Sequence, residues 1–153
     1  MDPVGALVTQ LAAASGVRVI GTAHPRNHSY VAQLRAEPVA YGAGWADRVR
    51  ALAPDGVDAA LDAAGVGVLE GSLTLCAAER VLLIADMTFG QHGVQFSSGP
   101  DEPDVAALQE TVQRVAAGEV TVQLAADFPL VGAAAAHQAM LDGHVPGKLI
   151  LVP

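Results

Sequence analysis

The most informative stretch of the chain is residues 17–22, whose sequence is VRVIGT. Such a short β-branched run is typical of a β-strand. A helical pattern precedes it over residues 4–15, where apolar residues recur at helical spacing and Gly16 follows as a stop signal. A second helical pattern follows over residues 27–34. A strand that lies between two helices predicts a sheet covered by helices.

The same alternation continues toward the C-terminus. Further helices are predicted over residues 45–53, 66–76, 104–117 and 129–141, and further strands over 38–41, 57–62, 80–85, 120–124 and 148–152. Residues 86–103 are rich in Gly, Ser, Pro and Gln, which predicts a long surface loop. Strands that alternate with helices of this length predict right-handed crossovers and a mostly parallel sheet, which is an α/β fold.

Composition narrows the class of protein further. The chain has 153 residues, of which 52% are hydrophobic and 16% are charged, so we expect one folded domain and not a disordered chain. The net charge is −8, which argues against nucleic acid and anionic membranes as partners, because both attract basic surfaces. No apolar run approaches the roughly 20 residues that a membrane span needs. A small molecule remains the expected ligand.

The chain has a single cysteine, Cys76, and its five histidines are scattered. One cysteine cannot form an intrachain disulfide, and the N-terminus lacks the pattern of a signal peptide, so we expect a reducing, cytoplasmic location. No residues have the spacing of a metal site, and none is predicted.

Ligands of parallel α/β sheets bind at the carboxyl ends of the strands. Four residues at or near that rim are predicted to be catalytic, namely Asp62, Asp86, His24 and His92. Carboxylates and imidazoles there can transfer protons near neutral pH. Each also has a structural alternative, because a carboxylate after a strand commonly caps the next helix and a loop histidine is commonly only solvated.

Four stretches of the sequence carry a resemblance to a known family. They are residues 4–12 (VGALVTQLA), 19–28 (VIGTAHPRNH), 61–73 (LDAAGVGVLEGSL) and 128–153 (FPLVGAAAAHQAMLDGHVPGKLILVP), of which the last is the most specific. On these residues the chain resembles the nucleotide-binding half of medium-chain dehydrogenase/reductases, in the zinc-free branch of the quinone oxidoreductases. The resemblance implies a Rossmann-like, three-layer αβα domain that binds NADPH.

The resemblance also implies positions for the cofactor. The pyrophosphate would rest on the backbone N–H groups of Val4 and Gly5 at a helix N-terminus. The 2′-phosphate would be held where NAD-dependent enzymes carry an acid, and this chain has none there. The residues implied to contact the cofactor are Val4, Gly5, Thr22, His24, Arg26, Tyr41, Ala63 and Ala85.

The chain departs from the family pattern at its start. The strand expected before the first helix is absent, and Asp2 and Pro3 stand where two glycines are expected. We therefore expect one truncated domain over residues 1–153, with a core at 1–119 and a C-terminal segment at 120–153. Either the strand at 17–22 pairs directly with that at 57–62, or another chain inserts a strand. A homodimer or a separately encoded partner domain is expected to cover exposed apolar surface.

Three functions stay open on the sequence. The first is an NADPH-dependent oxidoreductase domain of the quinone oxidoreductase or enoyl reductase type. The second is a cofactor-independent enzyme of specialised metabolism, such as a cyclase, isomerase or lyase, which binds a small molecule in the former cofactor cleft. The third is a binding protein without catalysis. The fold alone does not decide among them.

Overall fold

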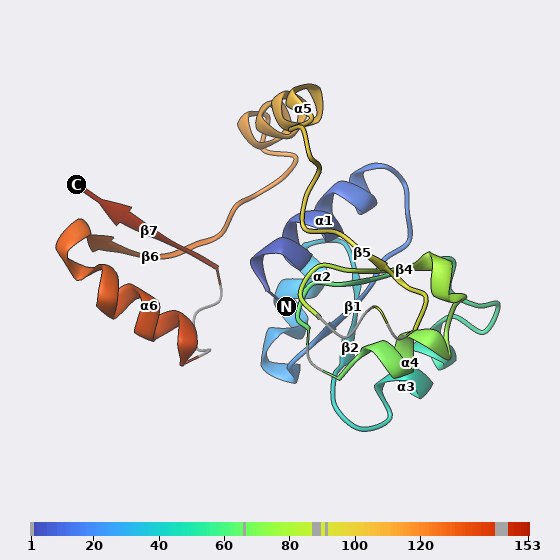
Figure 1. The fold of residues 1–153 in the computed structure, drawn as a ribbon. Coiled ribbons are helices and arrows are strands. Elements are labelled where there is room, and N and C mark those ends of the chain that lie inside the picture. The colour runs from blue at the N-terminus through green and yellow to red at the C-terminus, as the bar shows by residue number, and fades with distance from the viewer. Residues whose placement is uncertain (1, 66, 87–89, 91, 143–146) are drawn as a thin grey trace.

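The structure is a computed structural model that describes residues 2–65, 67–86, 90, 92–142 and 147–153 (Figure 1). Its first part comprises α1 (Pro3–Ala14), β1 (Ile20–Ala23), α2 (His28–Gln33), β2 (Glu37–Ala40), α3 (Trp45–Leu52), β3 (Ala60–Asp62), α4 (Leu69–Leu73) and β4 (Val81–Leu83). It continues with β5 (Gln95–Phe96), α5 (Val105–Ala116), β6 (Leu124–Pro129), α6 (Ala133–Leu141) and β7 (Lys148–Val152). Every strand pairing among these residues is parallel, which confirms the predicted α/β class.

The described strands form three separate sheets and not one. β1 pairs with β2, β3 pairs with β4 and β4 with β5, and β6 pairs with β7. Of the two expected alternatives, direct pairing of β1 with β3 is therefore wrong, and a strand from another chain stays a prediction. Each of the first two sheets packs around its own apolar cluster. Ala23, Val31 and Ala36 form the cluster of the first sheet, whereas the second packs around another set, namely Leu69, Val81 and Leu83.

Two strands differ from their predicted positions for visible reasons. β5 lies inside the predicted loop 86–103, where two residues suffice to pair with β4. β6 begins at Leu124, after the segment 120–124 that was predicted as a strand. Val120 is instead fully buried, and the side chain of Gln10 on α1 takes the hydrogen bonds that a neighbouring strand would make to Thr121.

Gln10 joins α1 to the segment that leads into β6. Its amide nitrogen donates to the carbonyl oxygen of Thr121 at 3.0 Å. Its amide oxygen accepts from the Thr121 backbone N–H at 2.8 Å and from the Thr121 hydroxyl at 3.1 Å. Since Gln10 is only 8% exposed, these bonds satisfy a buried amide and fix where the C-terminal segment leaves the core.

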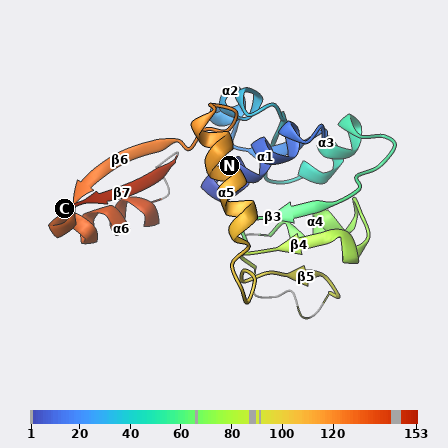
Figure 2. The same cartoon turned by 90° about the horizontal axis from the view of Figure 1, so that it is seen from above.

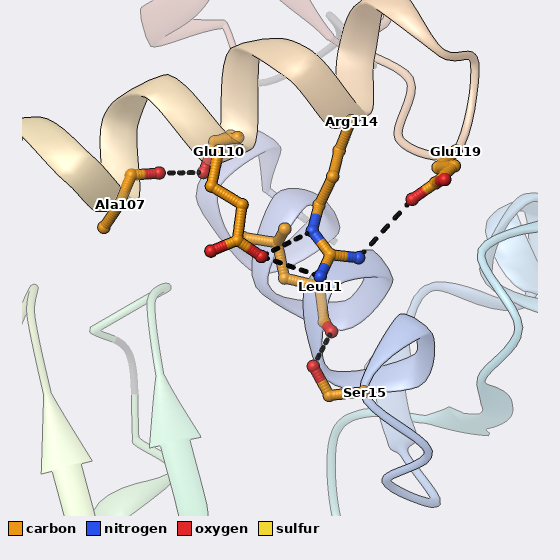
Figure 3. A network of polar contacts seen from close by, with 7 residues as sticks. Leu11, Ser15, Ala107, Glu110, Arg114 and Glu119 are labelled. Carbon is orange, nitrogen blue, oxygen red and sulfur yellow. Dashed lines mark hydrogen bonds and ion pairs between the residues drawn. The ribbon is translucent and has the colours of Figure 1, made fainter.

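Helix α5 is held at both ends by charged side chains. The Asp104 carboxylate accepts from the Ala107 backbone N–H at 2.9 Å, which caps its start. Near its end, Arg114 donates to Glu110 one turn earlier at 2.7 Å and to Glu119 at 3.5 Å (Figure 3). The Glu-to-Arg spacing of four residues is the favourable orientation for such a pair.

The unit of β6, α6 and β7 stands to one side of the remaining elements in both views (Figures 1 and 2). It exposes large apolar side chains, among them Leu130, Val131, Met140 and Leu141. The predicted boundary near residue 119 stays a prediction. Among the residues described above, no helix is both long and apolar enough to cross a membrane.

Candidate functional site

The structure places three of the residues that the resemblance assigns to the cofactor at the ends of two neighbouring strands. β1 and β2 lie side by side with Ala23 opposite Ala40, so the residues that follow these two strands become neighbours. His24 and Tyr41 follow them directly, and their rings meet edge to face with centroids 6.1 Å apart. Arg26 lies two residues further, in a short 3₁₀ turn that begins at Pro25. His24, Arg26 and Tyr41 are exposed, and we call them the β1–β2 edge cluster.

One hydrogen bond fixes the tautomer of His24. The Arg26 backbone N–H donates to Nδ1 of His24 at 3.2 Å, so Nδ1 carries a lone pair. In a neutral imidazole the proton is then on Nε2, which becomes a donor. The cluster therefore offers an imidazole N–H, a phenol hydroxyl and a guanidinium at one exposed edge. Such a set of donors suits an anion, and guanidinium pairs with phosphate oxygens in a bidentate manner.

Arg48 on α3 orders the loop beside this cluster, and the sequence did not point to it. Its guanidinium donates to the carbonyl oxygen of Ala40 at 2.7 Å and to that of Ala43 at 2.9 Å. These bonds fix the backbone on both sides of Tyr41. The available signal was the sequence GAG at residues 42–44, because a glycine-rich turn exposes carbonyl groups that a nearby cation can satisfy.

The N-terminus of α1 differs from the predicted pyrophosphate site. The Asp2 carboxylate caps this helix, and its Oδ1 accepts from the backbone N–H groups of Val4 and Gly5, each at 2.9 Å. Those are the two groups that the resemblance assigns to the pyrophosphate. In this structure the chain's own carboxylate occupies them. An acidic residue followed by proline is a recognisable helix start, so this cap was visible in the sequence.

Asp62 at the end of β3 makes a local turn. It is only 5% exposed, and its Oδ1 accepts from the backbone N–H groups of Ala64 at 2.9 Å and Gly65 at 3.0 Å. Its Oδ2 is buried and has no hydrogen-bond partner among the residues that the structure describes. Oδ1 therefore has the structural role that the sequence offered as the alternative to catalysis, because aspartate carboxylates commonly accept hydrogen bonds from the backbone of the following turn. A catalytic role for Asp62 stays a prediction.

The loops after β3 and β4 touch at Gly65. A Cβ atom at this position would lie 2.7 Å from the carbonyl oxygen of Ala85, which is closer than atoms of this kind approach, and Gly65 has a φ of +72°. Only glycine combines that backbone conformation with that close approach. The contact places Ala63 and Ala85, two predicted cofactor contacts, on neighbouring loops at one edge of the second sheet.

The remaining predicted residues are placed but not gathered into one site. Thr22 is half-buried within β1, and Asp86 is half-buried directly after the loop residue Ala85. His92 is exposed in the segment before β5. The structure thus places His24, Arg26 and Tyr41 at one edge, whereas the predicted catalytic residues Asp62, Asp86 and His92 belong to other elements.

A small pocket lies at the start of α1. Its wall includes Asp2, Leu7, Tyr30, Thr121 and Lys148. Burial raises the pKa of the Tyr30 phenol, so this hydroxyl is protonated at neutral pH and can donate a hydrogen bond. The pocket therefore combines a carboxylate, a phenol and an amine above an apolar floor.

Metal chemistry finds no support in the described part of the chain. There, no three His, Cys, Asp or Glu side chains come close enough to hold an ion together. Cys76 is half-buried, and its Sγ lies 3.8 Å from the carbonyl oxygen of Ser72. Burial and the nearby charge of Glu79 raise the pKa of this thiol, which favours the protonated form that binds metals poorly.

Fold and sequence together define a Rossmann-like α/β domain. The sequence pattern of the zinc-binding dehydrogenase family matches residues 30–151, which is most of the chain. The chain therefore belongs to this family, within the medium-chain dehydrogenase/reductases, which confirms the resemblance drawn from the sequence. The residues described here do not fit the zinc of the family's name. A search of curated proteins found no match.

Solved structures agree with this assignment. The structure of AibC superimposes with a TM-score of 0.81 at 25% identity, over 98% of this chain and 49% of that one. The quinone oxidoreductase from Coxiella burnetii gives 0.75 at 25% identity, over 98% of this chain and 50% of that one. A mycobacterial protein solved in complex with NADPH gives 0.75 at 24% identity, over 98% and 53%. This chain thus spans about half the length of the chains that it matches.

Proposed function

We propose that the chain is the NADPH-binding part of an oxidoreductase of the quinone oxidoreductase type. The observation that carries this proposal is the β1–β2 edge cluster. Membership of the family and the likeness to a protein solved with NADPH support it. When bound, NADPH would supply a hydride.

The residues of the cluster would recognise the 2′-phosphate, which distinguishes NADPH from NADH. Arg26 would pair its guanidinium with two oxygens of the 2′-phosphate. His24 would donate from Nε2, because Nδ1 already accepts from the Arg26 backbone. Tyr41 would donate its hydroxyl from the adjacent strand end, in the position that Arg48 fixes through the backbone. NADH lacks this phosphate, so the cluster predicts a preference for NADPH.

A titration with NADPH, followed by its fluorescence and by the melting temperature of the protein, tests this proposal. We expect binding that weakens about tenfold in Arg26→Ala, since a charge-assisted hydrogen bond contributes about 1.5–3 kcal/mol. Arg80→Ala is the matched control, because Arg80 is an exposed arginine just before β4, whereas the cluster lies after the carboxyl ends of its strands. An equal loss in both variants, or no response at millimolar NADPH, contradicts the proposal.

The chain spans about half the length of the chains that it matches. We propose that it acts as a homodimer or with a separately encoded partner domain, and in the cytoplasm. The exposed apolar residues of the β6–α6–β7 unit support this, since large apolar patches are rare on monomers. Sedimentation equilibrium at micromolar concentration tests the homodimer, and a monomer there contradicts it.

One observation favours a second function. Because Asp2 occupies the two N–H groups at the start of α1, the chain resists a pyrophosphate at that place. A cofactor-independent cyclase, isomerase or lyase would not need them. Asp62, Asp86, His24 and His92 would then be the candidates for proton transfer. Absence of NADPH binding, together with a thermal shift by apolar small molecules, would support this function against the first.

A further inference from the structure

The first turn of α1, residues 3–6, lies wholly within the described residues and has no free backbone donor. Pro3 has no N–H group, and those of Val4 and Gly5 donate to the Asp2 carboxylate at 2.9 Å each. The N–H group of Ala6 donates to the backbone carbonyl oxygen of Asp2 at 3.0 Å. Every backbone donor of this turn therefore ends on Asp2, so a bound anion would have to displace the carboxylate.

Displacement of Asp2 brings little gain to a ligand that carries a diphosphate. The hydrogen bonds that the diphosphate would gain are lost by the carboxylate, so the two changes largely cancel. The carboxylate also stays tethered beside the helix, where its charge repels the diphosphate. A helix N-terminus ordinarily favours an anionic ligand, but here the anion belongs to the chain itself. We therefore expect the diphosphate of a dinucleotide to contribute little to binding.

The β1–β2 edge cluster differs from this helix end, because its donors are available. The Arg26 guanidinium has no hydrogen-bond or ion-pair partner among the residues that the structure describes. The nearby guanidinium of Arg48 is instead taken up by backbone carbonyl oxygens, at 2.7 Å from that of Ala40 and 2.9 Å from that of Ala43. Tyr41 is 56% exposed. The cluster thus presents donors that can bind an acceptor from outside the chain.

A phosphate monoester matches these donors better than a diphosphate does. It offers three terminal oxygens and carries a charge of about −1.5 to −2 at neutral pH. Each phosphorus of a dinucleotide's diphosphate has fewer free oxygens and carries a single negative charge. The cluster combines a guanidinium fork with an imidazole N–H and a phenol hydroxyl, which suits a group with several free oxygens and a high charge.

We propose that this chain recognises the 2′-phosphoadenosine end of NADPH by itself, and that Asp2 keeps the diphosphate from adding to the affinity. Because the same cluster and the same cofactor are involved, this role of Asp2 rests on the proposed function. Asp2 is then a residue that determines specificity, since its carboxylate holds the place of the diphosphate on α1. A ligand that carries only the phosphomonoester binds about as tightly as the whole cofactor.

Calorimetric titrations of the full chain with three ligands separate the two anion sites. The phosphomonoester alone is present in 2′-AMP, the diphosphate alone in NADH, and both groups in NADPH. We expect the dissociation constants of 2′-AMP and NADPH to agree within about threefold. We expect NADH not to saturate the chain at millimolar concentration. This comparison uses the original chain and needs no variant.

Variants assign the effect to Asp2. Asp2→Asn keeps an oxygen that can cap α1 and removes the charge, so NADPH should bind about fivefold or more tightly while 2′-AMP binds as before. Asp104→Asn is the matched control, because Asp104 caps α5 through the Ala107 N–H at 2.9 Å. It should leave both affinities unchanged. Arg26→Ala should weaken 2′-AMP and NADPH alike, by about tenfold. Circular dichroism checks that each variant folds.

The outcomes distinguish this proposal from the proposed function. If NADPH binds the original chain at least about tenfold more tightly than 2′-AMP, the role of Asp2 is overturned and the proposed function stands. The role of Asp2 is also overturned if Asp2→Asn brings no gain for NADPH, or an equal gain for 2′-AMP. If 2′-AMP binds and NADPH does not, only the proposed function fails. Binding of neither ligand at millimolar concentration overturns both.

Discussion

Replacing Asp2 tests the organisation of the α1 N-terminus. Its Oδ1 accepts from two backbone N–H groups at 2.9 Å each, so Asp2→Ala leaves both without their partner. Loss of such a cap costs about 1 kcal/mol, within a range of about 0.5–2. For a chain of this size, 1 kcal/mol lowers the melting temperature by about 2–4 °C. Asp2→Asn keeps an oxygen acceptor and loses only the interaction of charge with the helix dipole, which is worth about 0.3–1 kcal/mol.

Urea unfolding followed by circular dichroism measures both variants. We expect Asp2→Ala to lose more stability than Asp2→Asn. In NADPH titrations we expect Asp2→Asn to bind more tightly than the original chain. The substitution removes a charge that repels phosphate by about 1 kcal/mol at 4 Å in water and by more in a protein. Its affinity for NADPH should rise about fivefold or more. If both variants are as stable as the original chain, or if Asp2→Asn leaves the affinity unchanged, the reasoning about this cap is refuted.

Three further predictions concern stability. Gly65→Ala should lower the free energy of unfolding in urea by about 1–3 kcal/mol, because its Cβ would clash with a backbone oxygen. Gly67→Ala has open space around its Cβ and should lose only about 1 kcal/mol, from its positive φ. Equal losses in the two variants would contradict the clash. Gln10→Ala should cost about 1–3 kcal/mol, since it leaves buried partners unsatisfied, and exposed Gln109→Ala should cost almost nothing; similar values would contradict the role of Gln10. Arg18 donates a hydrogen bond to the Glu37 carboxylate at 2.6 Å and thereby lowers the pKa of that carboxyl group below 4.5. The pair therefore contributes stability above pH 4.5 and loses it as the pH falls through the lowered pKa. Glu37→Gln should flatten that part of the acid unfolding curve, and an unchanged curve would contradict this.

Local sequence patterns predicted the helices and the end of the chain well. α5 lies where the helical pattern predicts it, and Asp104 caps its start. β7 coincides with the predicted strand at residues 148–152. The edge cluster was also predictable, since residues that follow adjacent parallel strands must become neighbours. These features depend on neighbours in sequence or on the rule that successive strands pair.

Long-range features were not predictable in the same way. The sequence left two arrangements of β1 and β3 open, and only the grouping of the strands into separate sheets distinguishes them. The displacement of β6 depends on the Gln10 amide, 111 residues from Thr121 in sequence. Arg48 escaped notice because its partners are carbonyl groups, which every residue has and which leave no mark on the sequence.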